Sequence, residues 1–193
     1  MTKSTRRVPF RRRREKKTNY AKRLMLLKSG KPRLVFRKTN RNCIVQIIKY
    51  LPAGDETVVH VTSKHLSKYG WPGKANIPSA YLCGYLAAKK GLKKGIKEAI
   101  LDIGRLTPVR GVCAFAALKG AIDGGLSVPC SKDIFPSDDR IRCKHIEEFA
   151  SKMSAENLKK NFSYYLTLGI DPTKIGEYFN KAKQAIDQEF NVK

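Results

Sequence analysis

Two short apolar segments separated by a polar stretch form the clearest pattern in the chain. Residues 34–36 are a run of three hydrophobic side chains, and within residues 43–48 apolar side chains recur at alternate positions. Such a pattern, rich in β-branched residues, is typical of strands with one buried face. The intervening residues 37–42 hold three cations and two asparagines, and asparagine tolerates the backbone conformations of tight turns. The pattern predicts a β-hairpin with a cationic tip.

A short amphipathic helix is predicted immediately before this hairpin. Apolar residues share one helical face from Tyr20 to Leu27, and Gly30 ends the pattern. The preceding residues 1–19 include four consecutive arginines at 11–14. Their charges repel one another, so we expect an extended basic arm. The arm and the short helix together make up an expected N-terminal segment, residues 1–32.

Alternating strand and helix patterns continue after the hairpin and define an expected core domain, residues 33–136. The predicted segments are strands at 58–61, 99–103 and 126–129 and helices at 76–91 and 111–124. The continuous apolar run 99–103 is typical of a strand covered on both faces. The order β-β-β-α-β-α-β predicts an α/β fold with a mixed β-sheet, an antiparallel meander plus parallel strands, packed with helices.

The remaining residues, 137–193, have the pattern of a helical C-terminal extension. Two helices are expected, one beginning near Asp138 and one at Asp171. Their apolar stripes are Ile141, His145, Phe149 and Met153 in the first, and Ile175, Phe179, Ala182, Ile186 and Phe190 in the second. Each stripe requires a partner surface. On such a stripe His145 is better explained as a packing residue than as a metal ligand.

The single tryptophan, Trp71, lies in a loop rich in glycine and proline, residues 64–74. Two interpretations are open. Trp71 could cover the edge of the core, because tryptophan is largely buried in most proteins. Alternatively, its ring could stack on an unpaired base or ribose of RNA.

Charge adds a strong indication of the partner. The 193 residues include 40 lysines and arginines against 16 acids, a formal net charge of +24. Seventeen of the cations fall within residues 1–41, where Glu15 is the sole acid. A basic excess gathered in one segment is the electrostatic footprint of a polyanion partner such as nucleic acid. The hydrophobic fraction of 41% is sufficient for a folded core.

Motifs for catalysis, cofactors and metals are absent from the sequence. The five cysteines are widely spaced without a CxxC pair, which favours reduced thiols in the cytosol. The histidines lack zinc spacing, and Cys143 to His145 is the closest approach to a metal pair. No phosphate-binding loop or nucleophile elbow occurs. We expect no enzyme, cofactor, metal site or small-molecule substrate, and the lack of long apolar runs predicts no signal peptide or membrane span.

Four segments carry further recognisable motifs. They are GKPRLVFRKTNRNCIVQ, KYGWPGKANIPSAYLCGYLAAKK, AILDIG and VCAFAALKGAIDGGLSVP. In composition and order they resemble the ribosomal large-subunit protein eighteen family, whose eukaryotic counterpart is called protein five. The resemblance runs from about Tyr20 to Ile146. The length is similar to that of archaeal members, because bacterial members lack a tail such as residues 147–193 and eukaryotic members carry a longer one.

This resemblance implies a structural protein of the cytoplasmic large ribosomal subunit, without enzymatic activity. Members of the family bind 5S rRNA and help to fix it to the large-subunit rRNA in the central protuberance, beside neighbouring ribosomal proteins. In that family the basic arm, the hairpin and the Tyr-Gly-Trp loop face RNA. The corresponding candidate RNA-binding residues are Arg7, Arg11, Arg12, Arg13, Arg14, Lys16, Lys17, Thr18, Tyr20, Arg23, Lys28, Arg33, Arg37, Lys38, Thr39, Asn40, Arg41, Tyr69 and Trp71.

The residue types agree with this expectation and leave two rival functions. Arginine and lysine neutralise phosphates, Thr39 and Asn40 could reach 2′-hydroxyls and base edges, and aromatic rings stack on unpaired bases. A nuclease would instead need clustered carboxylates to hold metal ions. Asp102, Asp123, Asp138 and Asp139 do not obviously converge. A free RNA chaperone, acting outside the ribosome, would show the same basic composition.

Overall fold

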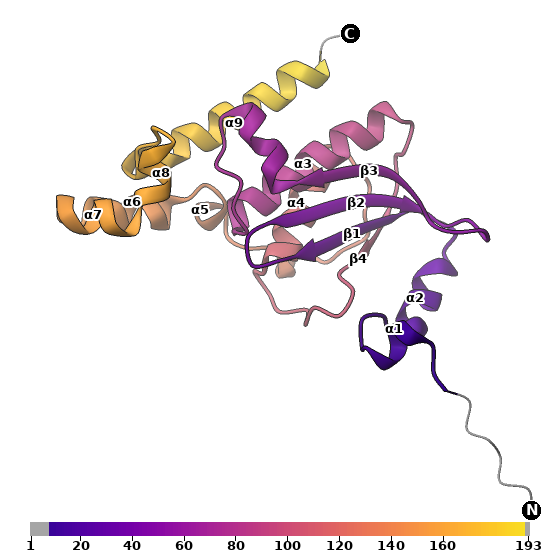
Figure 1. The fold of residues 1–193 in the computed structure, drawn as a ribbon. Coiled ribbons are helices and arrows are strands. Elements are labelled where there is room, and N and C mark those ends of the chain that lie inside the picture. Colours follow the sequence, from indigo (N-terminus) through magenta and orange to yellow (C-terminus); the bar gives the residue numbers. More distant parts are fainter. Residues whose placement is uncertain (1–7, 192–193) are drawn as a thin grey trace, which may run out of the picture.

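The predicted hairpin forms the centre of a mixed sheet. In the computed structural model, which describes residues 8–191, β1 (Arg33–Lys38) pairs antiparallel with β2 (Cys43–Lys49), and β2 pairs antiparallel with β3 (Glu56–Thr62). A short strand, β4 (Ile100–Asp102), lies parallel to β1. The strand order of the sheet is therefore β3-β2-β1-β4 (Figure 1). This arrangement confirms the expected α/β class with antiparallel and parallel pairs.

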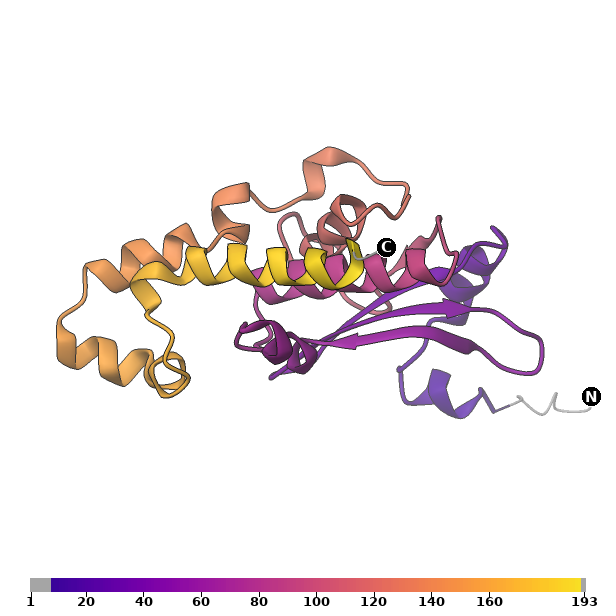
Figure 2. The same cartoon turned by 90° about the horizontal axis from the view of Figure 1, so that it is seen from above.

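The long helices lie on one side of the sheet, and shorter helices lie at both ends of the described molecule (Figure 1 and Figure 2). The N-terminal and central helices are α1 (Arg11–Arg14), α2 (Tyr20–Leu27), α3 (Ile77–Lys93) and α4 (Cys113–Asp123). The C-terminal helices are α5 (Asp138–Ile141), α6 (Lys144–Ser151), α7 (Ala155–Asn161), α8 (Ser163–Thr167) and α9 (Ile175–Asn191). Short 3-10 helices cover Ser63–Tyr69, Lys132–Ile134 and Pro172–Lys174.

One face of the sheet is buried beneath α3. The pairing of β1 with β2 places Leu34 opposite Ile47 and Phe36 opposite Val45, and all four side chains are buried. Because side chains alternate between the faces of a strand, this register puts the hydrophobic residues of both strands on the same side. The apolar face of the hairpin therefore stabilises the sheet, while its tip remains outside the core.

Helices α3 and α4 approach each other closely because glycines lie at their contact. A methyl group on Gly84 would lie 1.9 Å from the carbonyl oxygen of Ala117, and one on Gly120 would lie 2.1 Å from that of Tyr81. No side chain fits at such distances, so each glycine permits direct contact with the backbone of the opposite helix. This packing fixes the helical layer over the sheet.

The C-terminal extension is part of the same hydrophobic core. Helix α9 lies along α3 (Figure 2), and the Tyr85 hydroxyl of α3 donates a 2.5 Å hydrogen bond to Asp187 of α9. Ile175, Phe179 and Ile186 are buried against the central cluster. The apolar stripe expected on this helix is confirmed, and its partner surface is the core itself.

The other expected C-terminal stripe is wrong. Cys143 has a left-handed backbone conformation, with φ of 70°, and interrupts the helix between α5 and α6. The interruption rotates the face that follows, so His145 and Phe149 are exposed, whereas Ile141 and Ala150 are buried. The expectation that His145 packs on an apolar face is therefore also incorrect.

The last expected strand, residues 126–129, is reduced to a single bridge. Ser127 pairs with Glu98 in parallel, and its backbone amide donates to the carbonyl oxygen of Lys97 at 2.9 Å. Pro129, two residues after Ser127, has no amide hydrogen, so it cannot extend a ladder of hydrogen bonds.

Candidate nucleic-acid interface

The hairpin tip is a tight turn closed by its own side chains. Strand β1 continues to Lys38, so the turn comprises residues 39–42. The Thr39 hydroxyl donates to the carbonyl oxygen of Asn42 and accepts from its amide, both at 3.0 Å. Lys38, Asn40 and Arg41 are exposed. The turn therefore stabilises itself through Thr39 and presents two cations and one amide to solvent.

The described part of the basic arm, residues 8–19, contains a helical turn at Arg11–Arg14 rather than the expected extended chain, and residues 1–7 of the arm lie outside the described residues. Glu15 forms ion pairs with Arg11 and Lys17, at 3.7 Å and 2.8 Å, which reduces the repulsion within the run of cations. Lys16 adopts a positive φ of 52°, and the chain reverses there. After the reversal, Arg12 Nε donates to the Thr18 hydroxyl at 2.9 Å. Local pairing with Glu15 thus overcomes the repulsion on which the extended prediction depended.

Helix α2 holds this arm against the sheet. Asn19 caps its first turn, because the side-chain oxygen accepts from the backbone amide of Lys22. The Tyr20 ring lies 5.9 Å from that of Phe10, centroid to centroid, and so connects the arm to the helix. Further along α2, Arg23 donates two hydrogen bonds to Asp55, at 2.9 Å and 2.8 Å.

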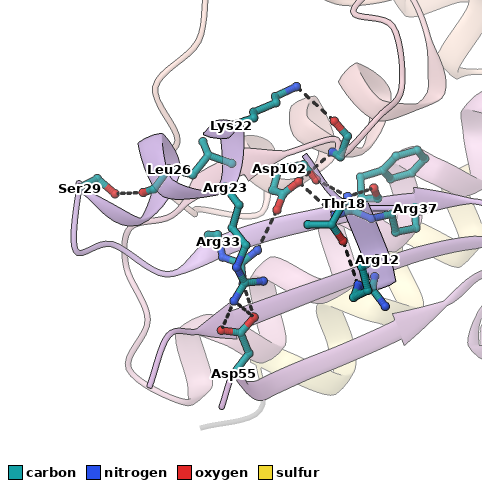
Figure 3. Close-up of polar contacts among 12 residues, drawn as sticks. Arg12, Thr18, Lys22, Arg23, Leu26, Ser29, Arg33, Arg37, Asp55 and Asp102 are labelled. Carbon is teal, nitrogen blue, oxygen red and sulfur yellow. Dashed lines mark hydrogen bonds and ion pairs between the residues drawn. The ribbon is translucent and has the colours of Figure 1, made fainter. Parts of the chain in front are cut away.

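A network of charges, buried at Arg33 and Asp102, lies where α2 meets the sheet (Figure 3). Arg33, 3% exposed, donates to Asp102 at 2.8 Å and to Asp55 at 2.6 Å. Arg37 donates to the carboxylate of Asp102 at 3.1 Å and to its carbonyl oxygen at 2.8 Å. The two carboxylates come from β4 and from the turn after β2, and Arg23 comes from α2, so the network connects four parts of the chain.

The Asp102 carboxylate is ionised in this environment. Burial alone would raise its pKa, but the charge of Arg37 and hydrogen bonds from Gly104, Arg33 and Arg37 outweigh burial and hold the pKa below its ordinary value. The amide of Gly104 donates at 2.8 Å. A charged Asp102 therefore anchors two arginines and the first turn of the loop that follows β4.

Sequence comparisons agree with the family suggested by the motifs. Residues 4–97 match the model for ribosomal large subunit proteins 60S L5 and 50S L18. The chain is 52% identical over 186 residues to large ribosomal subunit protein uL18 of Korarchaeum cryptofilum, covering 95% of both chains. It is 49% identical over 186 residues to the uL18 protein of Thermofilum pendens, covering 94% of this chain and 95% of the relative. The chain belongs to the uL18 family. The expected family, with archaeal relatives that are ribosomal structural proteins and not enzymes, is confirmed.

Within this uL18 family member, three of the candidate RNA-binding arginines have other partners. Arg23, Arg33 and Arg37 bind Asp55 and Asp102, and Arg33 is buried. The RNA-binding role of Arg33 stays a prediction; its side chain is only 4% exposed, and both terminal nitrogens of its guanidinium already bind carboxylates. Arg37 keeps a 42% exposed side chain and Arg23 one of 33%, so the network positions both at the surface.

The loop containing Trp71 is covered by the C-terminal helix. Trp71 is 1% exposed, its ring packs edge-on against Phe179 at 5.8 Å, and its Nε1 donates to the Ser79 hydroxyl at 2.8 Å. Stacking on RNA is therefore wrong for Trp71, and the alternative of core packing holds. Tyr69 is half-buried, and burial raises its pKa, with a further contribution from Glu189 of α9.

The remaining candidates are exposed on the arm, on α2 and at the hairpin tip. Arg7 lies outside the described residues. Within residues 8–191, the candidate cations without an ion pair to a carboxylate are Arg12, Arg13, Arg14, Lys16, Lys28, Lys38 and Arg41. Two further cations, Lys22 on α2 and Arg105 in the loop after β4, are exposed near these candidates. Arg105 was not among the predicted residues, although loops that follow the carboxyl end of a strand often carry functional residues.

The carboxylates proposed for a nuclease do not assemble. Asp102 is occupied by arginines, Asp123 accepts from the Tyr81 hydroxyl at 2.7 Å, and Asp138 pairs with Lys119. Across residues 8–191, no group of three or more histidine, cysteine or acidic side chains could hold a metal ion. In the same range, no helix combines the length and apolar character needed to cross a membrane.

Proposed function

We propose that this protein is a structural constituent of the large ribosomal subunit that binds 5S rRNA and helps to attach it to the large-subunit rRNA in the central protuberance. The observation that carries the proposal is the group of exposed cations on the arm and the hairpin tip. Their counterparts deeper in the fold are neutralised by Asp55 and Asp102. Exposed cations without carboxylate partners are available to phosphates.

The two cationic surfaces lie at different places along β1. Helix α2, which follows the arm, is connected to the start of this strand through Arg23, Asp55 and Arg33, and the tip follows the end of the strand at Lys38. Six residues of strand span about 20 Å. A ligand that contacts both surfaces must therefore extend over at least this distance, which a folded RNA does and a single nucleotide does not.

Titration of 5S rRNA with variants of the hairpin tip tests the proposal. Arg41→Ala should weaken binding and lower the slope of log affinity against log salt by about one unit, because one phosphate contact is lost. Asn40→Ala should weaken binding with the slope nearly unchanged, because the amide is neutral. Arg140→Ala is the matched control, since Arg140 is exposed on α5 in the C-terminal extension.

Lysine at position 41 adds a second comparison. An ammonium cannot reproduce bidentate or stacked guanidinium contacts, so Arg41→Lys should restore the salt slope but only part of the affinity. Folded tip variants, and a variant with serine at residues 11–14, that all bind 5S rRNA like the wild type would refute the proposal. Sedimentation with the large subunit separates a ribosomal constituent from a free RNA chaperone.

A further inference from the structure

A polar cavity separates the N-terminal segment from the loop that follows β4. One part, about 560 Å³, is lined by Arg13, by residues 18–22 and by residues 104–106. A second part, about 500 Å³, shares most of this lining and extends to Arg33 and Asp102. We call both parts together the arm–loop cavity. Their size is within the range of cavities that hold small organic ligands.

The charge of this lining favours an anion. Asp55 and Asp102 are the carboxylates of the lining, and Arg23, Arg33 and Arg37 already neutralise them. Arg12, Arg13, Lys22 and Arg105 also line the cavity and form no ion pair within residues 8–191. The cavity is therefore positive after its internal pairs are formed, and an acidic or phosphorylated ligand is attracted to it.

The floor of the cavity contains an unused hydrogen-bond donor. Arg33 Nε is buried and has no hydrogen-bond acceptor among the described residues, although both terminal nitrogens of the same guanidinium bind carboxylates. A buried donor without an acceptor is unfavourable. Arg33 lines the deeper part of the cavity. Arg33 therefore adds positive charge beneath the cavity, while its Nε has almost no exposed surface and does not itself contact a ligand.

An aromatic ring completes the lining. Tyr20 is 38% exposed, lines both parts of the cavity and is supported by Phe10 at 5.9 Å. Unpaired RNA bases typically stack on such rings while arginine binds the adjoining phosphate. Thr18 and Asn19 add a hydroxyl and an amide in the same wall. An aromatic face beside free cations suits a nucleotide better than an acidic peptide, which has no ring to stack.

We propose that the arm–loop cavity binds one unpaired nucleotide of ribosomal RNA, with its base against Tyr20 and its phosphate at Arg105. This inference rests on the proposed function, because it identifies what part of the RNA the N-terminal segment receives. It also adds the loop after β4 to the RNA interface.

Variants of Tyr20 and Arg105 in the full-length protein test the inference. Tyr20→Leu removes the stacking ring, whereas Tyr20→Phe retains it. Arg105→Ala removes the cation, and Arg110→Ala is the matched control, because Arg110 is exposed in the same loop but does not line the cavity. Each variant is titrated with a 5S rRNA transcript and, separately, with large-subunit rRNA. Chemical probing then reports the flexibility of every nucleotide.

We expect both variants to change the reactivity of one nucleotide only. Tyr20→Leu and Arg105→Ala should each raise Kd about 10-fold and should restore reactivity at the same single unpaired nucleotide in one of the two RNAs. Tyr20→Phe, which keeps the ring, should retain most of the affinity that Tyr20→Leu loses, and Arg110→Ala should match the wild type. Circular dichroism and thermal melting confirm that each variant is folded.

Other results would overturn the inference in distinguishable ways. If Tyr20→Leu and Arg105→Ala keep the wild-type footprint on both RNAs while tip variants lose 5S rRNA affinity, the cavity is not a nucleotide site and the proposed function stands. Diffuse changes over many nucleotides would indicate a general electrostatic effect, which also contradicts a single-nucleotide site. Normal RNA binding with loss of subunit incorporation would indicate a protein ligand instead. If tip and arm variants also bind normally, the proposed function itself fails.

Discussion

Asp102 organises the N-terminal part of the molecule at the scale of a single residue. It is the one acid in an otherwise apolar strand segment, and it accepts from Arg33, Arg37 and the amide of Gly104. Burying a charged carboxylate is unfavourable unless opposite charges and hydrogen bonds compensate, and here they do. The same residue thus stabilises β1 and β4 and positions the loop that lines the arm–loop cavity.

Asp102→Asn should destabilise the protein by about 3 kcal/mol, because Arg33 would remain as a buried charge with one partner fewer. Urea denaturation of the wild type and the variant measures the difference in the free energy of unfolding. Asp139→Asn is the control, since the Asp139 side chain is 68% exposed and should contribute less than about 1 kcal/mol. Equal stability of Asp102→Asn and the wild type would show that the network contributes nothing to the fold.

The stability difference between the wild type and Asp102→Asn should depend on pH. The pKa of Asp102 is lower in the folded protein than its unfolded value of about 3.9, so the ionised carboxylate stabilises the fold fully at higher pH. This contribution should decrease as the pH falls from about 4 toward the folded pKa. Unfolding free energies measured between neutral pH and about pH 3 should therefore converge for wild type and Asp102→Asn. A difference that stays constant over this range would contradict the assignment.

At the scale of elements, the C-terminal helix determines the role of a loop far from it in sequence. Helix α9 covers the segment after β3, with Phe179 against Trp71 and also 5.7 Å from the Tyr81 ring. Lys68 and Glu189 form an ion pair at 2.9 Å across the same contact. Trp71, in the loop that resembles an RNA-binding motif in sequence, is thereby part of the internal packing of this fold.

Phe179→Ala should destabilise the protein by about 3–5 kcal/mol, because it removes a buried aromatic ring between two others. Trp71 is the single tryptophan, so its fluorescence reports the environment of this contact directly. We expect a lower unfolding midpoint and a red-shifted emission maximum. Phe149→Ala is a suitable control because Phe149 is 54% exposed. Wild-type stability and emission in Phe179→Ala would mean that α9 does not pack on this loop in solution.

At the scale of the whole molecule, the basic segment and the C-terminal helices lie at opposite ends. Figure 1 places α1 and α2 at one end and α6–α8 at the other, with the sheet between them. The exposed apolar side chains of the C-terminal end are Phe149, Tyr164, Leu166 and Leu168. Residues 8–32 hold ten cations and one acid, whereas residues 144–167 hold four cations and three acids. The uncompensated positive charge is therefore at the end away from this apolar surface, which favours RNA binding through the N-terminal end.

RNA binding should depend steeply on salt because this charge acts collectively. If about 6–10 phosphates are neutralised, affinity for 5S rRNA should fall on the order of 10³–10⁵ between roughly 50 and 200 mM salt. A chain lacking residues 1–19 should show a clearly smaller slope while retaining its fold, because the core lies after that segment. Filter binding at several salt concentrations measures both. A flat response in the full chain would show that the charge serves solubility alone.

The sequence by itself determined the hairpin, the meander and the apolar stripe of α9. Each depends on a local alternation of side chains, and burial of one face needs only that pattern. Tertiary structure alone decided the partners of the charged and aromatic residues. Arg33 and Asp102 are 69 positions apart in the sequence. Trp71 packs against Phe179, which belongs to the C-terminal helix. An arginine on a strand looks the same in sequence whether it faces a phosphate or a distant carboxylate. The difference appears only when folding brings the acid within hydrogen-bonding distance and removes water from both charges.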